Sequence, residues 1–138
     1  MRFALSVLVA DASSLVDFLI RRKRVGDWVA ELLKESGIAH CPHLVDVEVA
    51  SSLRRLTSHG DLDVTVAERA LADFVELRIQ RYPMTLLLGR LWSLRESLSA
   101  YDAAYIALAE ALNLPLLTTD KRLARSRGHK AEIVLFPG

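Results

Sequence analysis

The sequence predicts an α/β fold, a three-layer α/β/α sandwich with a central parallel sheet of four to five strands. Short apolar runs of strand length alternate with longer segments whose apolar residues recur at helical spacing. Turn-forming residues such as Gly37, Gly60 and Pro83 separate these segments where helices begin or end. Strands that alternate with helices in this way pair in parallel, and the helices cover both faces of the sheet.

Each expected element follows from its apolar pattern and its flanking residues. The first apolar run resembles the core of a signal peptide, but it is short and follows one basic residue, which favours a fully buried strand. The expected strands are Phe3 to Ala10, Ile38 to Pro42, Arg78 to Tyr82, Leu114 to Thr118 and Ile133 to Phe136. The expected helices are Ala12 to Lys23, Val25 to Glu35, about His43 to Gly60, Thr65 to Leu77, Pro83 to Leu94, Ser99 to Asn113 and Lys121 to Arg127.

Length and composition limit the class of protein. With 138 residues and no internal repeat, the chain is expected to form one domain, residues 1–138. Its 18 basic and 17 acidic residues give a net charge of +1, which excludes a strongly cationic surface for bulk nucleic-acid binding. A single cysteine, Cys41, excludes an intrachain disulfide, and we expect a cytoplasmic protein.

Three aspartates are expected at one edge of the sheet. Asp11 and Asp120 each follow a predicted strand, and Asp102 begins a helix that runs antiparallel to the strands. All three therefore lie at the carboxyl edge, where open α/β sheets bind ligands. Taken singly, each aspartate is better explained as a helix cap, with Ser99 completing an S-x-x-D pattern before Asp102.

Glu48 does not fit a capping role. It lies one turn into its helix, beside the apolar stripe, and a half-buried carboxylate needs a partner. Carboxylates that are brought together raise one another's pKa and are tolerated mainly when a cation neutralises them. Oxygen ligands of this kind select Mg²⁺ or Mn²⁺.

Four segments resemble the motifs of PIN domains, and of VapC-type toxins in particular. The resemblance covers nearly the whole chain, in the order and spacing of the family. The segments are Val9 to Val16, with Asp-Ala-Ser after a strand; His43 to Val49 with Leu53 to Leu56; Tyr101 to Ala109; and Leu116 to Leu123. The stretch Leu91 to Arg95 is also similar to one that many VapC toxins carry.

The resemblance implies a metal-dependent endoribonuclease that acts as the toxin of a toxin–antitoxin pair. It implies that Asp11, Glu48, Asp102 and Asp120 are catalytic and bind Mg²⁺ or Mn²⁺, one or two ions. Ser13 and Thr118 are candidates to support these ligands by hydrogen bonds, as is Thr119. Thr118 and Thr119 are at least as well explained by a strand end that donates to a turn.

The resemblance also implies partners. RNA is the expected substrate, and Arg54, Arg55 and Arg122, which flank the acidic motifs, are candidates to hold its phosphates. The family further implies a homodimer and a VapB-like antitoxin whose C-terminal segment lies across the acidic groove. We hypothesise that a basic antitoxin side chain competes there with the metal.

Several alternatives remain open at this point. A non-catalytic PIN-like module would use the acidic pocket only to hold RNA or a protein. A phosphoryl-transfer protein also places an aspartate after its first strand, but Ser13 stands where the dehalogenase type needs a second aspartate. The metal chemistry would also cut DNA, although the resemblance favours RNA.

Other residues receive structural interpretations. A zinc site at His40, Cys41 and His43 is disfavoured, because no matching Cys or His pair occurs elsewhere. Trp92 and Tyr105 could stack on bases, but their apolar helical stripes favour core or dimer packing. The basic run 21–24 is interpreted as a solvated helix end.

Overall fold

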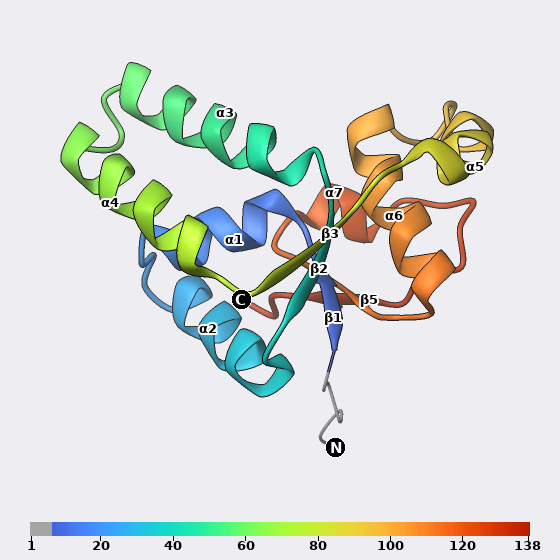
Figure 1. Ribbon diagram of the computed structural model, residues 1–138, viewed down its shortest axis with the longest axis horizontal. Coiled ribbons are helices and arrows are strands. Elements are labelled where there is room, and N and C mark those ends of the chain that lie inside the picture. The colour runs from blue at the N-terminus through green and yellow to red at the C-terminus, as the bar shows by residue number, and fades with distance from the viewer. Residues whose placement is uncertain (1–6) are drawn as a thin grey trace.

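The computed structural model describes residues 7–138, which form a parallel sheet with helices packed on it (Figure 1). The strands are β1 (Leu8–Ala10), β2 (Ala39–Pro42), β3 (Ile79–Tyr82), β4 (Leu116–Thr118) and β5 (Ile133–Leu135). The helices are α1 (Ala12–Leu19), α2 (Val25–Ser36), α3 (Val45–Ser58), α4 (Val64–Glu76), the 3₁₀ turn η1 (Thr85–Leu87), α5 (Leu88–Ser93), α6 (Ala100–Leu112) and α7 (Lys121–Ala124).

The five strands lie in the order β3-β2-β1-β4-β5, and every pair is parallel. Val9 of β1 is in register with His40 of β2 and with Leu116 of β4. The chain adds β2 and β3 on one side of β1, then crosses back to add β4 and β5 on the other. The strand order therefore reverses between β1 and β4, and the crevice at the carboxyl ends of such strands is where α/β sheets bind ligands.

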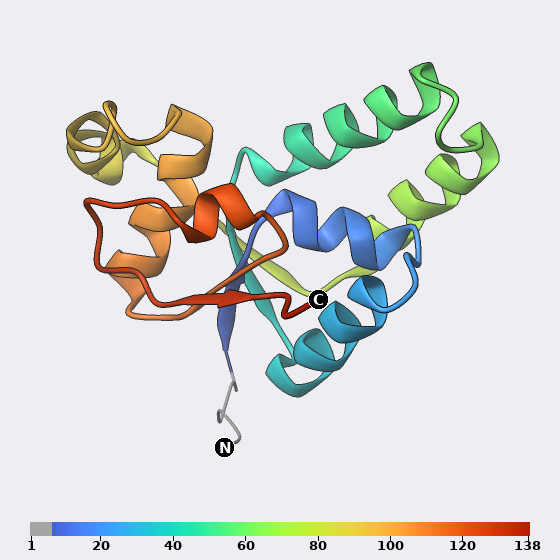
Figure 2. The ribbon, with the colours of Figure 1, turned by 180° about the vertical axis from the view of Figure 1, so that it is seen from behind.

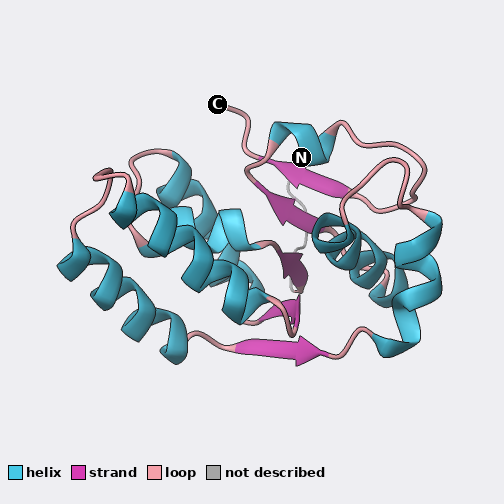
Figure 3. Ribbon diagram, turned by 90° about the horizontal axis from the view of Figure 1, so that it is seen from above, coloured by secondary structure: helices cyan, strands magenta, loops and turns pink. Residues whose placement is uncertain are grey.

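Helices cover both faces of the sheet, as Figure 3 shows from above. Helices α1 to α4 pack on one face and α5 with α6 on the other. Residues of β1 alternate between the two layers, because Leu8 and Ala10 belong to the core on the α1 side and Val9 to the core on the α6 side. The predicted three-layer sandwich with a parallel sheet is confirmed.

The element bounds follow the prediction with a few differences. The first predicted strand is shorter in the structure, and the part of it from Phe3 to Ser6 lies outside the described residues. The helix expected from Pro83 is divided into η1 and α5. Gly37 ends α2 with a φ of 77°, a left-handed conformation that suits glycine, as predicted.

Helix α1 ends at Leu19 instead of Lys23, because the chain turns back there. Arg21 adopts a φ of 58°, and its N–H donates to the carbonyl of Phe18, while the N–H of Arg22 donates to the carbonyl of Asp17. This pair of bonds closes the helix in a Schellman motif. The basic run 21–24 therefore forms the turn between α1 and α2, visible from behind in Figure 2.

None of the helices within residues 7–138 combines the length and the apolar character needed to cross a membrane.

Candidate active site

The four predicted acids line one cavity of about 460 Å³ at the carboxyl edge of the sheet. Each comes from a different place in the chain: the end of β1, the first turns of α3 and α6, and the residue before α7. Figures 1 and 2 show α1 and α7 side by side at this edge. The cavity is lined by Asp11, Ala12, Ser13, Val47, Glu48, Ser51, Ser52, Arg55, Tyr101, Asp102, Tyr105 and Asp120.

Asp11 is buried, with 5% of its surface exposed, and four donors surround its carboxylate. Oδ1 accepts from the backbone N–H of Ser14 at 2.9 Å, from Ser14 Oγ at 2.8 Å and from Ser13 Oγ at 2.9 Å. Thr118 Oγ1 donates to Oδ2. Burial raises the pKa of Asp11 and these hydrogen bonds oppose that rise. Asp11 thus caps α1, and it also lines the cavity.

Glu48 lies half-buried on α3, and its partner is Tyr105 of α6. The Tyr105 hydroxyl donates to Glu48 Oε1 at 2.7 Å. Burial raises the pKa of Glu48, the hydrogen bond from Tyr105 lowers it, and the negative charges of Asp102 and Asp11 raise it further. These charges act on Glu48 because the acids share one cavity.

Asp102 and Asp120 share a cation from the protein itself. The Arg122 guanidinium donates to Asp102 Oδ2 at 2.8 Å and to Asp120 Oδ2 at 3.2 Å. Asp120 also caps α7 by accepting from the backbone N–H groups of Arg122 and Leu123. The Arg122 side chain is 68% exposed, so its contacts with the carboxylates are open to solvent.

The donor set suits a hard divalent cation. Carboxylate and hydroxyl oxygens are the groups that Mg²⁺ and Mn²⁺ prefer, and the mutual repulsion seen at Glu48 is what a cation relieves. In the described part of the chain, no group of three Asp, Glu, His or Cys side chains is close enough together to coordinate one ion with the side chains in their present positions. The acids therefore fit such an ion by their chemistry and common cavity, with Arg122 bridging two of them.

The remaining predicted site residues occupy different places. Arg55 lines the cavity and donates to the hydroxyls of Ser51 and Ser52 on its own helix, both at 3.2 Å. Arg54 is exposed on the same helix but lies outside this cavity. Thr118 donates to Asp11 and accepts from the N–H of Asp120, so it serves both the acid and the turn.

Sequence reasoning did not assign Tyr105 to the site and missed Asp17 altogether. Tyr105 is 2% exposed, as expected of a core residue, yet its hydroxyl reaches Glu48; its position one turn after Asp102 was the available signal. Asp17 is buried and accepts from Thr119 Oγ1 and from Arg22, both at 2.9 Å. Arg22 is therefore ion-paired, which corrects the interpretation of its run as merely solvated.

The histidine and cysteine residues near β2 face different surroundings. Cys41 is buried and donates to the carbonyl of Ala10, and burial raises its pKa to about 12. His40 instead lies 2.6 Å from the Tyr82 hydroxyl through Nδ1. Successive strand residues point to opposite faces of a sheet, so these two side chains do not converge on one ion.

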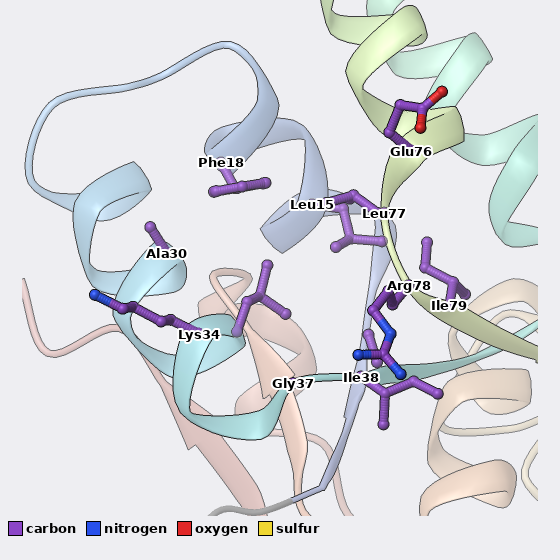
Figure 4. A pocket seen from close by; sticks show the side chains of 12 residues that line it. Leu15, Phe18, Ala30, Lys34, Gly37, Ile38, Glu76, Leu77, Arg78 and Ile79 are labelled. Atoms are coloured by element: carbon purple, nitrogen blue, oxygen red, sulfur yellow. The ribbon is translucent and has the colours of Figure 1, made fainter.

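A cavity of about 370 Å³ lies at the opposite, amino edge of the sheet (Figure 4). Its walls are mainly apolar and include Phe18 of α1, Ile38 before β2 and Ile79 of β3. Lys34 of α2 and Arg78 contribute the cationic ends seen in Figure 4. Because it contains no cluster of acids, this cavity is not the candidate catalytic site.

The fold and the acidic cavity define the class: an α/β protein with carboxylates gathered where the strand order of a parallel sheet reverses. A model of the PIN domain family matches residues 8–128. The chain belongs to the PIN domain family, as its motifs predicted.

Relatives match along most of the chain. The VapC ribonuclease Mb0985 of Mycobacterium bovis is 41% identical over 131 residues, which covers 95% of this chain and 99% of that protein. Ribonuclease VapC1 of Mycobacterium tuberculosis H37Rv is 41% identical over 128 residues, covering 92% and 96%. The crystal structure of PAE2754 from Pyrobaculum aerophilum matches with a TM-score of 0.66 and 27% identity, covering 94% of this chain and 85% of that one.

The raised pKa of Glu48 predicts that the substitution Glu48→Gln stabilises the protein when no divalent metal is present. The folded pKa lies above the ordinary value of 4.5, so the ionised carboxylate costs stability. That cost is complete above the folded pKa and vanishes below the unfolded one. We expect the melting temperature in EDTA to be higher than that of the wild type at about pH 7.5, and the gain to shrink as the pH falls toward 4.5.

Glu31→Gln, at an exposed position of α2, is the matched control and should leave the melting temperature unchanged across this pH range. A Glu48→Gln variant that melts below the wild type at neutral pH, or a gain independent of pH, would contradict the electrostatic account of the cavity.

Proposed function

We propose that this protein is a metal-dependent endoribonuclease of the VapC kind, the toxin of a toxin–antitoxin pair. The observation that carries the proposal is the meeting of Asp11, Glu48, Asp102 and Asp120 in one cavity at the switch point of the sheet. Relatives that cover nearly all of this chain are named VapC ribonucleases, which supports RNA as the substrate. In this proposal the toxin acts on cellular RNA in the cytoplasm.

In this proposal the four acids hold Mg²⁺ or Mn²⁺. Such an ion, when bound, lowers the pKa of a water molecule and stabilises charge on phosphate and leaving-group oxygens. The chain's own residues prepare the site. Ser13, Ser14 and Thr118 fix the orientation of the Asp11 carboxylate, and Tyr105 fixes that of Glu48.

The arginines beside the acids have a separate role toward RNA. Arg122 pairs with Asp102 and Asp120 in the structure, and its guanidinium would be free to turn toward RNA if a divalent cation neutralised these acids. Once released, Arg122 is placed to donate to a nonbridging phosphate oxygen beside the acids. Arg55, which lines the cavity from α3, is placed to donate to the same strand.

The competing function is a PIN-like module that binds RNA or protein without cutting it. Such a module does not require the carboxylates to be prepared for a cation. The hydrogen bonds that hold Asp11 and Glu48 in place therefore favour the nuclease.

Asp11→Asn is predicted to abolish cleavage of total RNA that the wild type performs with Mg²⁺ or Mn²⁺. The substitution removes a ligand charge, and activity should fall at least about a hundredfold, in the range seen when one group that stabilises transition-state charge is lost. Gel analysis of fragments after incubation with and without EDTA measures the effect.

Asp61→Asn, an exposed aspartate outside the cavity, should cut RNA like the wild type. Cleavage that persists in EDTA, or in the Asp11 variant with the fold intact, would place the chemistry elsewhere. RNA that binds but stays whole with every divalent ion would favour the binding module.

We also propose that two copies associate through the exposed apolar side chains of η1 and α5. Leu86 is 97% exposed, and Leu88 and Trp92, one helical turn apart, are 57% and 69% exposed. A cluster of large apolar side chains on the surface marks an interaction site. Trp92 thus lies outside the core, which leaves packing between copies as its expected role.

Trp92→Glu is predicted to convert the dimer to a monomer, since it places a charge within the apolar contact. Sedimentation velocity over a range of concentrations reads the mass directly. Val75→Glu, at a 76% exposed position of α4, serves as the control and should leave the mass unchanged. A wild type that stays monomeric at every concentration, or a dimeric Trp92→Glu variant, contradicts this interface.

A VapB-like antitoxin is the second proposed partner. Arg122 already supplies a cation to Asp102 and Asp120 from within the chain, which shows that a guanidinium fits between these acids. A basic antitoxin side chain in the same cavity would compete with the metal in the same way.

The antitoxin proposal predicts that the inhibited complex binds Mn²⁺ at least about tenfold more weakly than the free toxin, because two cations cannot share the same carboxylates at full strength. Isothermal titration of each with Mn²⁺ makes the comparison. An inhibited complex that keeps the full Mn²⁺ affinity of the free protein would refute the competition.

A further inference from the structure

A cavity of about 430 Å³, the second cavity at the carboxyl edge of the sheet, adjoins the acidic one. Four residues line both cavities, so the two form one continuous depression. The shared residues are Ser13, Ser52, Arg55 and Asp120. The second cavity is otherwise lined by Val16, Asp17, Arg22, Leu56, His59 and Thr119.

The second cavity differs from the first in chemistry. Where the acidic cavity collects carboxylates, this one has Arg22 and Arg55 beside the imidazole of His59, over the apolar side chains of Val16 and Leu56. Such a mixture of cationic and apolar groups suits a nucleotide, which carries an anionic phosphate and a flat, largely apolar base.

Arg22 is held in place rather than being a loose surface cation. Its Nη1 donates to Asp17 Oδ1 at 2.9 Å, and Thr119 Oγ1 donates to the other oxygen of Asp17 at 2.9 Å. The Asp17 side chain is 10% exposed, whereas that of Arg22 is 50% exposed. A buried carboxylate thus anchors an arginine that still presents half of its surface to the outside.

The acids of the second cavity are each neutralised. Asp17 is paired with Arg22, and Asp120 with Arg122. Arg55 remains as a cation at the boundary between the two cavities. Within residues 7–138 its guanidinium donates to serine hydroxyls of its own helix, and its positive charge lowers the pKa of Glu48. An anion entering here therefore meets an attractive charge at the point where the depressions join.

We propose that this second cavity holds one unpaired nucleotide of the RNA strand, adjacent to the phosphate that lies over the acids. The inference rests on the proposed nuclease function. Arg55 contacts the phosphate that links the two positions, and Arg22 contacts the neighbouring phosphate or ribose. The base lies between His59 and the partly exposed side chain of Leu56.

The size of the cavity selects the strand state of the substrate. A volume of about 430 Å³ is in the range of small-molecule sites, so the depression has room for one base that is turned out of a helical stack. A duplex would have to unpair to place a base there, at a cost in free energy. The site is therefore specific for single-stranded segments such as loops.

Fluorescence anisotropy with a fluorescein-labelled single-stranded RNA oligonucleotide, in EDTA so that no cleavage occurs, tests this site. His59→Ala should weaken binding about tenfold, within the range measured for loss of one base contact. Arg22→Gln should weaken it by a similar factor, because it removes a charge-assisted contact to phosphate. For Arg22→Gln, the slope of the logarithm of the binding constant against the logarithm of the salt concentration should become shallower by about 0.7. This is the value for one phosphate contact on a single strand. A duplex of the same sequence should bind the wild type more weakly.

Lys23→Gln is the matched control, because Lys23 is the exposed neighbour of Arg22 and lines neither cavity. It removes the same charge from the same turn and should change binding less than twofold. His59 ends α3 on the surface, so its variant also tests the site if Arg22→Gln lowers the melting temperature.

Equal binding by the wild type and the His59→Ala variant would overturn the nucleotide site. Equal losses of RNA affinity in Lys23→Gln and Arg22→Gln would also overturn it, as would tighter binding of the duplex than of the single strand. These outcomes leave the nuclease proposal standing if the wild type still cuts RNA with Mn²⁺. If the wild type binds and cuts single-stranded RNA while both cavity variants keep full affinity, the nucleotide site is wrong and the nuclease proposal stands.

Discussion

Repulsion among carboxylates gathered in a partly buried cavity is the constraint around which this molecule is organised. Like charges that share a low-dielectric pocket destabilise one another, and here burial and neighbouring acids both raise the pKa of Glu48. Hydrogen-bond donors from the fold stabilise these carboxylates. They are serine and threonine hydroxyls around Asp11, a tyrosine hydroxyl on Glu48 and a guanidinium between Asp102 and Asp120. Such a site is built to accept positive charge.

The topology of the sheet explains how acids so distant in sequence meet. Strand β1 is central and fully buried, with β2 on one side of it and β4 on the other. Asp11 and Asp120 follow the neighbouring strands β1 and β4, so they emerge at the same edge. The crossover helix α6 and the helix α3 bring Asp102 and Glu48 to that edge because helices in α/β units run antiparallel to the strands.

Much of this was predictable from the sequence, since it depends on local pattern. Apolar runs located the strands, and the aspartates that follow two of them were expected at one edge. The bond from Tyr105 to Glu48 was not predictable, because it joins α6 to α3 across a distance of 57 residues and Tyr105 also fits a core pattern. The pairing of Arg22 with Asp17 was hidden for a similar reason: a Schellman turn, invisible in the apolar periodicity, folds the basic run back onto α1.

The central claim is that the cavity lined by Asp11, Glu48, Asp102 and Asp120 binds a divalent cation. Anomalous diffraction at the manganese absorption edge, from crystals grown with Mn²⁺, locates that ion without reference to activity. The account predicts a peak in this cavity in contact with the Asp11 carboxylate, with Arg122 moved away from the acids. Ordered density for all four carboxylates with manganese peaks only elsewhere on the protein would contradict it.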